Sequence, residues 1–395
     1  MPQQVRWRKQ GTVPYVASQL STFQLARGMV YRSLALRLQA QIVTSAGGTI
    51  GTALTNAGVS AGGIWDIAQT IEIIANGSDS LKRFSGLELR ELNKFWFSTP
   101  LRPDGWVPFP SSGTTIASID STLMLPFWML KAIRPIDTAL DSRLLSSLQI
   151  NVTWGNVFNV VSSAYTPVAN NTASFASNPV MTVYSNESFD PTKTQAFSQF
   201  RVFKQIDTSD FSGGAVTQVP YQLPVGQMYR GFYIHAQAAT PSSGANTGLT
   251  VDQTGAAIGG VTRGPLNAIR VKSGTTVFAD WDATVWQGSY GLQDAILRTE
   301  DTAGVQIEQG GLMGASSNYL PDAHYFVDLC TDGFLSEAID TIGMAEIHLE
   351  FDTNIAIPQL NILPMQIIPV RSAQAQGNAV ASGATSAAGA SGSAS

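Results

Sequence analysis

The feature that most constrains this chain of 395 residues is an internal repeat with an offset of about 197 residues. An opening motif occurs twice with identical spacing, as Phe23, Gly28 and Tyr31 and again as Tyr221, Gly226 and Tyr229. Segments 71–78 and 268–275 also match, as do two alternating runs that contain Trp154 and Phe351. Two long copies are too few for a solenoid. Three matches in the same order therefore predict a duplicated domain in which these residues occupy equivalent structural positions.

Most of the hydrophobic periodicity has a period of two residues. The runs 34–40, 148–154, 232–238 and 347–351 alternate apolar and polar residues, as half-buried β-strands do. Clusters of Gly, Ser, Thr, Asn and Pro separate them and are typical of turns between strands. The pattern predicts an all-β chain built from sandwiches or barrels.

Helical signals are few and short. Residues 85–97 are the best candidate, because Ser85 and Glu88 have the spacing of a capping box. Glu88 and Glu91 would lie one helical turn apart and face solvent. Shorter helical turns are expected near residues 137–145 and 333–339.

Composition shifts suggest five segments. We expect a basic N-terminal arm at 1–16, a first unit at 17–161, a connector at 162–181, a second unit at 182–370, and an Ala/Ser/Gly-rich flexible tail at 371–395. The tail has too few apolar residues to order itself. Segments 98–117 and 240–264 are long Gly/Ser/Thr-rich loops, of a length that is usually functional.

Charge is scarce in this chain. Charged residues make up 13% of the sequence and the net charge is -5. A charge-poor surface associates readily, so the composition favours a protein that packs against other copies, although an uncharged extracellular surface explains it equally well. The acidic balance disfavours sequence-specific or wholesale nucleic-acid binding.

One basic cluster stands out near the N-terminus. Arg6, Trp7, Arg8 and Lys9 combine positive charge with an aromatic ring and could contact lipid headgroups or a genome. The competing interpretation is a solvated chain end.

The sequence offers only weak catalytic candidates. Gly58 to Gly62 matches the nucleophile-elbow pattern around Ser60 but lacks the strand and helix that the motif requires. The histidines His235, His324 and His348 have no zinc-ligand spacing. Asp280 and Asp282 flank Trp281 and could bind a cation or a sugar, although a solvated strand face is the simpler interpretation. We expect no enzymatic activity, no metal and no cofactor.

Cysteine content and hydropathy bear on the compartment. Cys330 is the single cysteine, so no intrachain disulfide can form, and the protein is expected to mature in a reducing cytoplasm as a chain with a buried thiol. No signal peptide is visible, and the apolar run 123–130 is too short to span a membrane.

The ends of the two units carry a resemblance. Residues 123–128 form an apolar strand with Pro-Phe-Trp, 137–141 a short helical connector, and 148–154 a closing strand. With the repeated Gln-Leu-x-x-Gly-x-x-Tyr-Arg opening, this arrangement resembles the double jelly-roll major capsid proteins of tailless icosahedral viruses, especially membrane-containing bacteriophages. The similarity extends over most of residues 17–370 as a pattern.

The resemblance implies a fold, a function and a set of partners. The fold would be two tandem eight-stranded jelly-roll β-sandwiches with a few short helices. The chain would form pseudo-hexameric homotrimers that contact neighbouring trimers in a virion shell after synthesis in the host cytoplasm. Penton, minor capsid or cement proteins and inner membrane lipid headgroups are further candidate partners. Segments 98–117 and 240–264 would form outer towers, Arg6 to Lys9 would lie inside, and the tail could thread between tiles.

Two other classes of function stay open. One is a two-domain β-sandwich that binds carbohydrate or serves as a viral attachment protein. The other is a β-sandwich hydrolase that uses Ser60 or the pair Asp280 and Asp282.

Overall fold

The computed structural model describes residues 5–46, 63–97, 113–130, 132–133, 135–160, 172–188, 198–203, 205–207, 215–237, 257–258, 261–262, 266–282, 324–330, 332–353, 357 and 359–369. The described helices are α1 (Gly86–Phe97), α2 (Val157–Val160) and the 3-10 turns η2 (Gly63–Ile67), η3 (Pro135–Thr138), η4 (Ser142–Leu144) and η5 (Leu335–Glu337).

The strands of the first half are β1 (Val5–Val13), β2 (Leu20–Gln24), β3 (Val30–Ala46), β4 (Ala68–Ala75), β5 (Asp79–Phe84), β6 (Gly113–Pro126), β7 (Leu140–Asp141), β8 (Leu148–Trp154) and β9 (Thr172–Ser188). Those of the second half are β10 (Ser198–Phe203), β11 (Gln205–Asp207), β12 (Val219–Gln222), β13 (Met228–Gln237), β14 (Ala257–Ile258), β15 (Val261–Thr262), β16 (Leu266–Ser273), β17 (Thr276–Asp282), β18 (His324–Asp328), β19 (Ile339–Asp340), β20 (His348–Thr353) and β21 (Gln359–Pro369).

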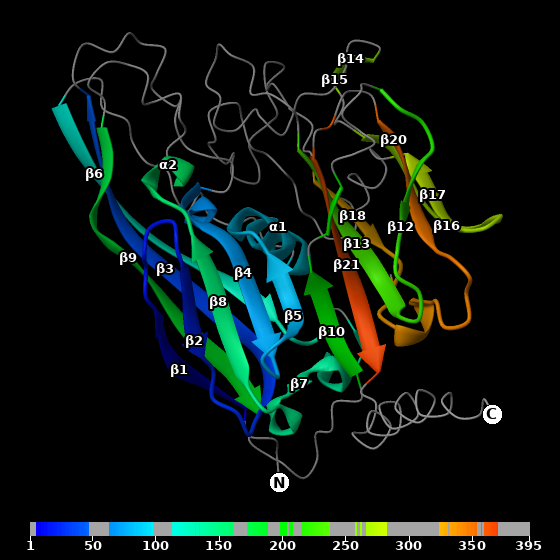
Figure 1. Ribbon diagram of the computed structural model, residues 1–395, viewed down its shortest axis with the longest axis horizontal. Coiled ribbons are helices and arrows are strands. Elements are labelled where there is room, and N and C mark those ends of the chain that lie inside the picture. Colours follow the sequence, from blue (N-terminus) through cyan, green and yellow to red (C-terminus); the bar gives the residue numbers. More distant parts are fainter. Residues whose placement is uncertain are drawn as a thin grey trace, which may run out of the picture.

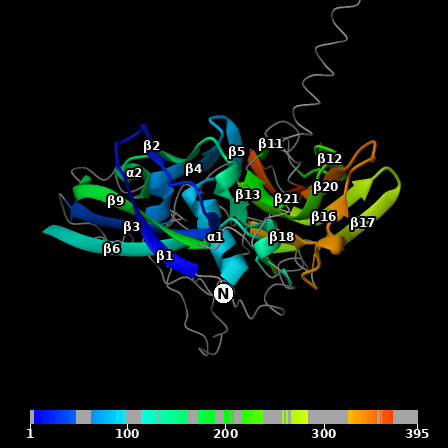
Figure 2. The same cartoon turned by 90° about the horizontal axis from the view of Figure 1, so that it is seen from below.

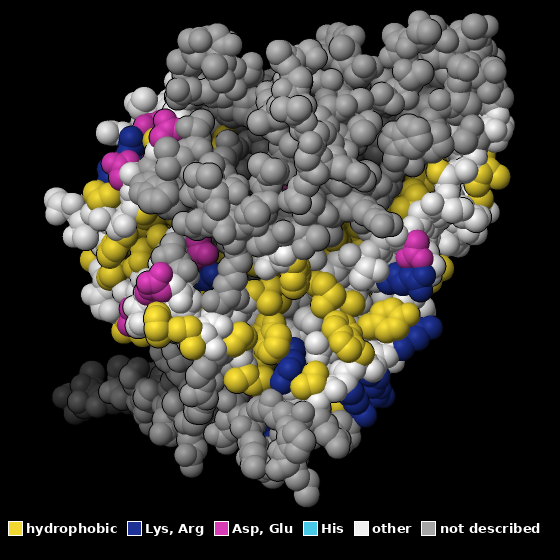
Figure 3. Space-filling model, turned by 180° about the vertical axis from the view of Figure 1, so that it is seen from behind, with side chains coloured by type: hydrophobic (Ala, Val, Ile, Leu, Met, Phe, Trp, Pro, Cys, Tyr) yellow, Lys and Arg dark blue, Asp and Glu magenta, His cyan; other side chains and the backbone are white. Residues whose placement is uncertain are grey.

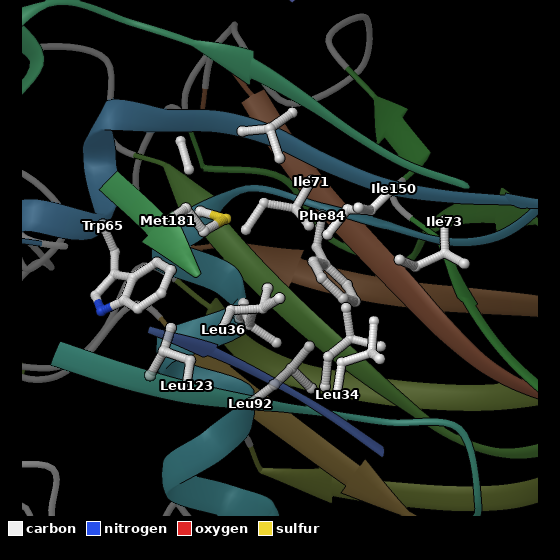
Figure 4. Packing of buried hydrophobic residues seen from close by; sticks show 14 of the residues in the cluster. Leu34, Leu36, Trp65, Ile71, Ile73, Phe84, Leu92, Leu123, Ile150 and Met181 are labelled. Carbon is white, nitrogen blue, oxygen red and sulfur yellow. The ribbon is translucent and has the colours of Figure 1, made fainter. Parts of the chain in front are cut away.

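The first half is a sandwich of two antiparallel layers. One layer has the strand order β1-β9-β3-β6, with β7 beside β3, and the other has the order β2-β8-β4-β5 (Figure 1). Alternating apolar residues from both layers meet between them, including Leu34 and Leu36 on one side and Ile71, Ile73 and Phe84 on the other (Figure 4). Leu34, Leu36, Ile71 and Ile73 have no exposed surface, as expected for the inner faces of a packed sandwich.

The second half repeats this topology strand for strand. Its layers have the orders β10-β21-β13-β18, with β19 beside β13, and β12-β20-β16-β17. Each strand of the first half therefore has a counterpart, from β1 and β10 to β9 and β21. The predicted duplication and the predicted fold, two tandem eight-stranded jelly rolls with few short helices, are confirmed.

The strand pairing moves three of the expected boundaries. Residues 5–13 are not an arm outside the first unit but its strand β1, which pairs with β9. Residues 172–181 are not a connector and 182–188 do not open the second unit, because β9 pairs with β3 along most of its length. The first unit therefore runs from 5 to 188 and the second from 198 to 369. The tail 371–395, most of 98–117 and most of 240–264 lie outside the described residues.

The two units share one sheet. β5 of the first unit pairs in parallel with β10 of the second, with Val202 opposite Lys82 and Phe203 opposite Arg83. This junction joins two four-stranded layers into the central sheet of Figure 1. The core of the first unit continues across it, since Tyr233, Leu363 and Met365 belong to the same buried cluster as Leu34. Strands β13 and β21 are consequently covered on both faces, which explains why residues 360–367 of β21 are all buried, the polar Asn361 and Gln366 included.

The repeated opening motif makes the same contacts in both units. The Tyr31 hydroxyl donates to the carbonyl oxygen of Ala26, and the Tyr229 hydroxyl donates to the carbonyl oxygen of Pro224. Gly28 and Gly226 both adopt positive φ, at 96° and 83°, in the turn between these partners. A side chain at either position would strain the backbone, so glycine is required here by conformation.

The expected equivalence of Trp154 and Phe351 is wrong by two residues. Phe23 lies opposite Ile150, and its counterpart Tyr221 lies opposite Leu349, so Ile150 matches Leu349. Trp154 is therefore not the counterpart of Phe351, which instead matches Val152. Because side chains repeat every two residues, a slip of two keeps the same face, and the alternation alone could not reveal it.

Helix α1 begins at its predicted cap. The Ser85 amide donates to Glu88 Oε2 over 2.7 Å, and the Glu88 amide donates to Ser85 Oγ over 3.2 Å, which completes the capping box. Glu88 and Glu91 do not face solvent as expected, because both are buried. Glu91 Oε1 instead lies 3.2 Å from the Arg90 guanidinium. Buried charges of this kind are retained when they are paired.

Candidate functional surfaces

The basic N-terminal segment forms an edge strand. β1 pairs with β9 and, among the described residues, with no other strand. Alternation places Arg6 and Arg8 on the face that turns toward the sandwich interior, and Trp7 and Lys9 on the opposite face. The four residues therefore do not form one patch but are divided between two faces of a sheet edge.

Arg6 is fixed by a buried partner. Its Nε lies 2.7 Å from Oε1 of Glu187, a side chain with 0% exposure, while the Arg6 side chain is 39% exposed. Ser185 Oγ donates to the other Glu187 oxygen over 3.1 Å, and Gln10 Nε2 donates to Ser185 Oγ over 2.7 Å. Burial, with a further contribution from the nearby Glu187 carboxylate, raises the pKa of Tyr31 well above its ordinary range. Arg6 thus serves the attachment of β1 to the first unit.

Trp7, Arg8 and Lys9 remain accessible. Trp7 is 55% exposed, and Arg8 and Lys9 are also exposed. Seen from behind, the lower half of the described surface carries hydrophobic and basic side chains, with few acidic ones among them (Figure 3). Lys9 shares the face of Trp7, and an exposed indole beside a cation suits a contact with anionic groups, because tryptophan combines an apolar body with a polar tip.

The two ends of the sandwiches differ. β1 begins beside Ser188 and Val30, at the end where short turns such as 25–29, 76–78 and 224–227 join the strands. The strand ends that flank 47–62, 98–112, 238–256 and 283–323 lie at the other end. The parallel pairing of β5 and β10 gives both units the same polarity (Figure 1). Trp7 to Lys9 therefore lie toward the short-turn end.

A second charged group lies on β16 and its neighbours. Arg270 contacts Asp280 on β17 through Nε at 2.8 Å, and contacts Glu350 and Asp352 on β20 at 3.1 and 2.8 Å. Lys272 Nζ adds a contact of 2.9 Å to Glu350. Burial alone would raise the pKa of Asp352, but hydrogen bonds from Arg270 and from the Gln218 amide hold it below its usual value. This network ties together three strands of the sheet, and of its residues only Asp280 stood out as a candidate in the sequence.

The weak catalytic candidates gain no support from geometry. Gly58 to Gly62 lies outside the described residues. His235 is buried on β13, where its Nδ1 lies 3.4 Å from Asn361 Nδ2. Asp280 is engaged by Arg270 in the network described above. Within the described part of the chain, no group of three or more His, Cys, Asp or Glu side chains is arranged to hold a metal ion.

Two further observations concern the cysteine and the helices. Cys330 is buried and unpaired as a thiol, and burial raises its pKa to about 12. A thiol in that state is inert at neutral pH. None of the helices in the described ranges is long and apolar enough to cross a membrane.

The chain was compared with known proteins by sequence and by structure. No family model matches the sequence, and no curated protein matches it. The atomic structure of Sulfolobus turreted icosahedral virus contains a similar chain, with a TM-score of 0.62 at 13% identity, covering 96% of each chain. The major capsid protein of bacteriophage PM2 is similar with a TM-score of 0.54 at 11% identity, covering 94% of this chain and 99% of that one. A capsid chain of the PBCV-1 virus gives a TM-score of 0.53 at 11% identity, covering 93% and 94%.

These similarities extend over whole chains. The shared feature is therefore the complete double jelly roll, including the side-by-side placement of its units, and not a single sandwich. Identities this low establish the fold alone.

Proposed function

We propose that this chain is a major capsid protein, three copies of which form a pseudo-hexameric tile of an icosahedral viral shell. The observation that carries the proposal is the parallel junction of β5 and β10, which fixes two jelly rolls of equal topology and polarity side by side. Three such chains supply six similar units, and closed cyclic symmetry is the common outcome for identical subunits. The capsid proteins of similar fold support this interpretation.

The polarity of the units suggests an orientation in the shell. The short-turn end, with Trp7, Arg8 and Lys9, would face inward toward membrane lipid headgroups or the genome. The end that carries the longer connections would face outward, in keeping with towers at 98–117 and 240–264. Neighbouring trimers and penton, minor capsid or cement proteins are the proposed partners. The protein would be made in the host cytoplasm and reside in the virion.

We propose a structural role without catalysis. A carbohydrate-binding or attachment function is the alternative that would use the Asp280 region, but Arg270 already engages Asp280 at 2.8 Å. A sugar or cation would have to compete with a guanidinium in a network of three carboxylates.

Size-exclusion chromatography with light scattering tests the proposal. We expect a homotrimer that persists at low protein concentration, and negative-stain images with six-sided outlines. A monomer that shows sugar-dependent increases in melting temperature would contradict the capsid role and favour the lectin, because a ligand of the native state raises its stability.

A vesicle experiment tests the inward surface. The variant Lys9→Gln should reduce co-sedimentation of the protein with vesicles containing anionic phosphatidylglycerol, and should not change it with neutral phosphatidylcholine. The control is Arg37→Gln, which removes a cation that is paired with Asp120 on β6. Equal binding by the wild type and the Lys9→Gln variant would refute the proposed lipid contact.

A further inference from the structure

The junction between the two units involves strands that each exist twice in the chain. β5 and β17 are counterparts, because each is the hairpin partner of the strand that follows the first long loop. β10 and β1 are counterparts, because each pairs with the last strand of its unit. Within one chain, β5 of the first unit is joined to β10 of the second. Their counterparts, β17 of the second unit and β1 of the first, are not joined to each other within the chain.

Both remaining strands end their sheets. Among the described residues β17 pairs with β16 only, and β1 pairs with β9 only. Figures 1 and 2 show them on opposite halves of the molecule, so they cannot meet within one chain. Open strand edges with unused amides and carbonyls are templates for pairing with another chain.

We infer that β17 of one copy pairs in parallel with β1 of the next, and that this strand addition is the interface that closes the trimer. The inference rests on the proposed function for the number of copies, and deepens it by naming the contact. It is a head-to-tail interface, in which each copy supplies one edge of each kind, and such an interface forms a ring when its rotation closes.

The repeat fixes the register of the pairing. Counterparts are found by following paired residues from strand to strand, starting at the equivalent residues Phe23 and Tyr221. From Phe23 the pairs run through Ile150 and Ile73 to Lys82. From Tyr221 they run through Leu349 and Val271 to Ala279, which is therefore the counterpart of Lys82. In the other layer the equivalent residues are Gly231 and Ser33. The pairs run from Gly231 through Met365 to Val202, and from Ser33 through Asn186 to Trp7, so Trp7 is the counterpart of Val202. Within one chain, Val202 lies opposite Lys82 and Phe203 lies opposite Arg83. The corresponding pairs between two chains are predicted to be Trp7 with Ala279 and Arg8 with Asp280.

The side chains of the two edges complement each other. The predicted register sets the exposed cation of Arg8 beside Asp280, whose side chain is 55% exposed. A carboxylate can accept several hydrogen bonds, so the contact of Asp280 Oδ1 with Arg270 leaves room for Arg8. The intrachain junction has no such ion pair, since Phe203 lies opposite Arg83 there. The charge pair would favour the interchain partner over a second copy of β10.

Exposure of β17 also indicates a missing neighbour. Phe278 is 39% exposed and Val277 is 48% exposed. Leu81, the counterpart of Phe278 on the joined strand β5, is only 2% exposed. Two adjacent exposed apolar side chains on an edge strand are unfavourable in water. A docked β1, which itself carries Trp7 at 55% exposure, would cover them.

Disulfide trapping tests this contact. Neighbouring strands lie about 4.8 Å apart, within the Cα separation that a disulfide tolerates. The variant Trp7→Cys/Ala279→Cys should form a covalent trimer under mild oxidation, visible on a non-reducing gel and lost on reduction. Each single cysteine variant should stay monomeric on that gel. In Trp7→Cys/Thr276→Cys the partner is displaced by three residues, or about 10 Å, and should not be trapped.

Charge exchange gives a second readout. Arg8→Asp should weaken trimer association about tenfold or more, and Arg8→Asp/Asp280→Arg should recover most of it, with circular dichroism confirming that each variant is folded. A stable trimer that gives neither crosslink nor charge rescue would overturn the strand pairing and leave the capsid proposal intact. A monomeric wild type would overturn both.

Discussion

Arg6 on the first strand is ion-paired with Glu187, 181 residues later in the chain, through a contact of 2.7 Å between Arg6 Nε and Glu187 Oε1. The pair joins the first and last strands of one jelly roll, and its carboxylate has no access to solvent. A basic N-terminus that looks like a free arm is therefore a structural strand whose attachment depends on charge.

Replacing Arg6 should destabilise the first unit. Arg6→Ala leaves the Glu187 carboxylate buried without its cation, at a cost of about 1–3 kcal/mol, because Ser185 still donates to it. Chemical denaturation of the variant should show this loss, while Lys9→Ala, at an exposed position, should lie within about 0.5 kcal/mol of the wild type. If Arg6→Ala/Glu187→Gln is as unstable as Arg6→Ala alone, the ion pair is not the cause.

The duplicated tyrosines should respond alike. Tyr31→Phe and Tyr229→Phe each remove a hydroxyl that donates to a carbonyl five residues earlier. The expected cost is about 1 kcal/mol for each, since one hydrogen bond of a buried tyrosine is lost. Urea unfolding curves would measure both, and a loss in one unit without a loss in the other would show that the two hydrogen bonds are not equivalent.

The turn glycines offer a conformational test. Gly28→Ala and Gly226→Ala add a Cβ that meets no atom within 4 Å, so any cost comes from the positive φ and not from a clash. We expect a loss of about 1–2 kcal/mol for each. Gly28→Asn and Gly226→Asn are the matched controls, because asparagine tolerates this region better than alanine. Melting temperatures that rank alanine above asparagine would contradict the explanation.

Acid should loosen the sheet that contains Asp352. The pKa of Asp352 is lowered in the folded protein, so its contribution to stability is fully present above about pH 4 and is lost as the pH falls through the folded value. Asp352→Asn should be less stable at neutral pH and should show a shallower loss of stability between about pH 5 and pH 2. Thermal unfolding across that range measures the difference. If the stability of the variant falls with pH as steeply as that of the wild type, other carboxylates cause the loss of stability in acid.

The sequence predicted what depends on local pattern. The repeated Tyr-Arg openings and the alternating strands gave the duplication and the fold, and Ser85 with Glu88 gave the start of α1. β1 was missed because it carries charges on both faces, with Arg6 and Arg8 on the inner face and Lys9 on the outer one, and because the partner that balances Arg6 lies far along the chain. The first half of β9 was missed because it is rich in Ser, Ala and Asn and is largely exposed, and residues 182–188 were assigned to the wrong unit.

Other features are set by the tertiary structure alone. Lys82 reads as a surface residue in the sequence but has 0% exposure, because β5 lies in the middle of a shared sheet. The pairing of β5 with β10 depends on how two complete sandwiches meet, and no local pattern encodes it. The candidate contact of Arg8 with Asp280 becomes apparent only once that pairing is known.

The shared sheet has a consequence for biosynthesis. β5 is synthesised more than a hundred residues before β10. The folded first unit therefore presents the edge of β5, on which β10 and the rest of the second unit can begin to fold. A fragment restricted to residues 198–369 would emerge without that template and with the apolar face around Tyr233 and Leu363 uncovered. The first unit thus serves as a template for folding of the second. Although the two units share an origin, the order in which they are synthesised cannot be exchanged.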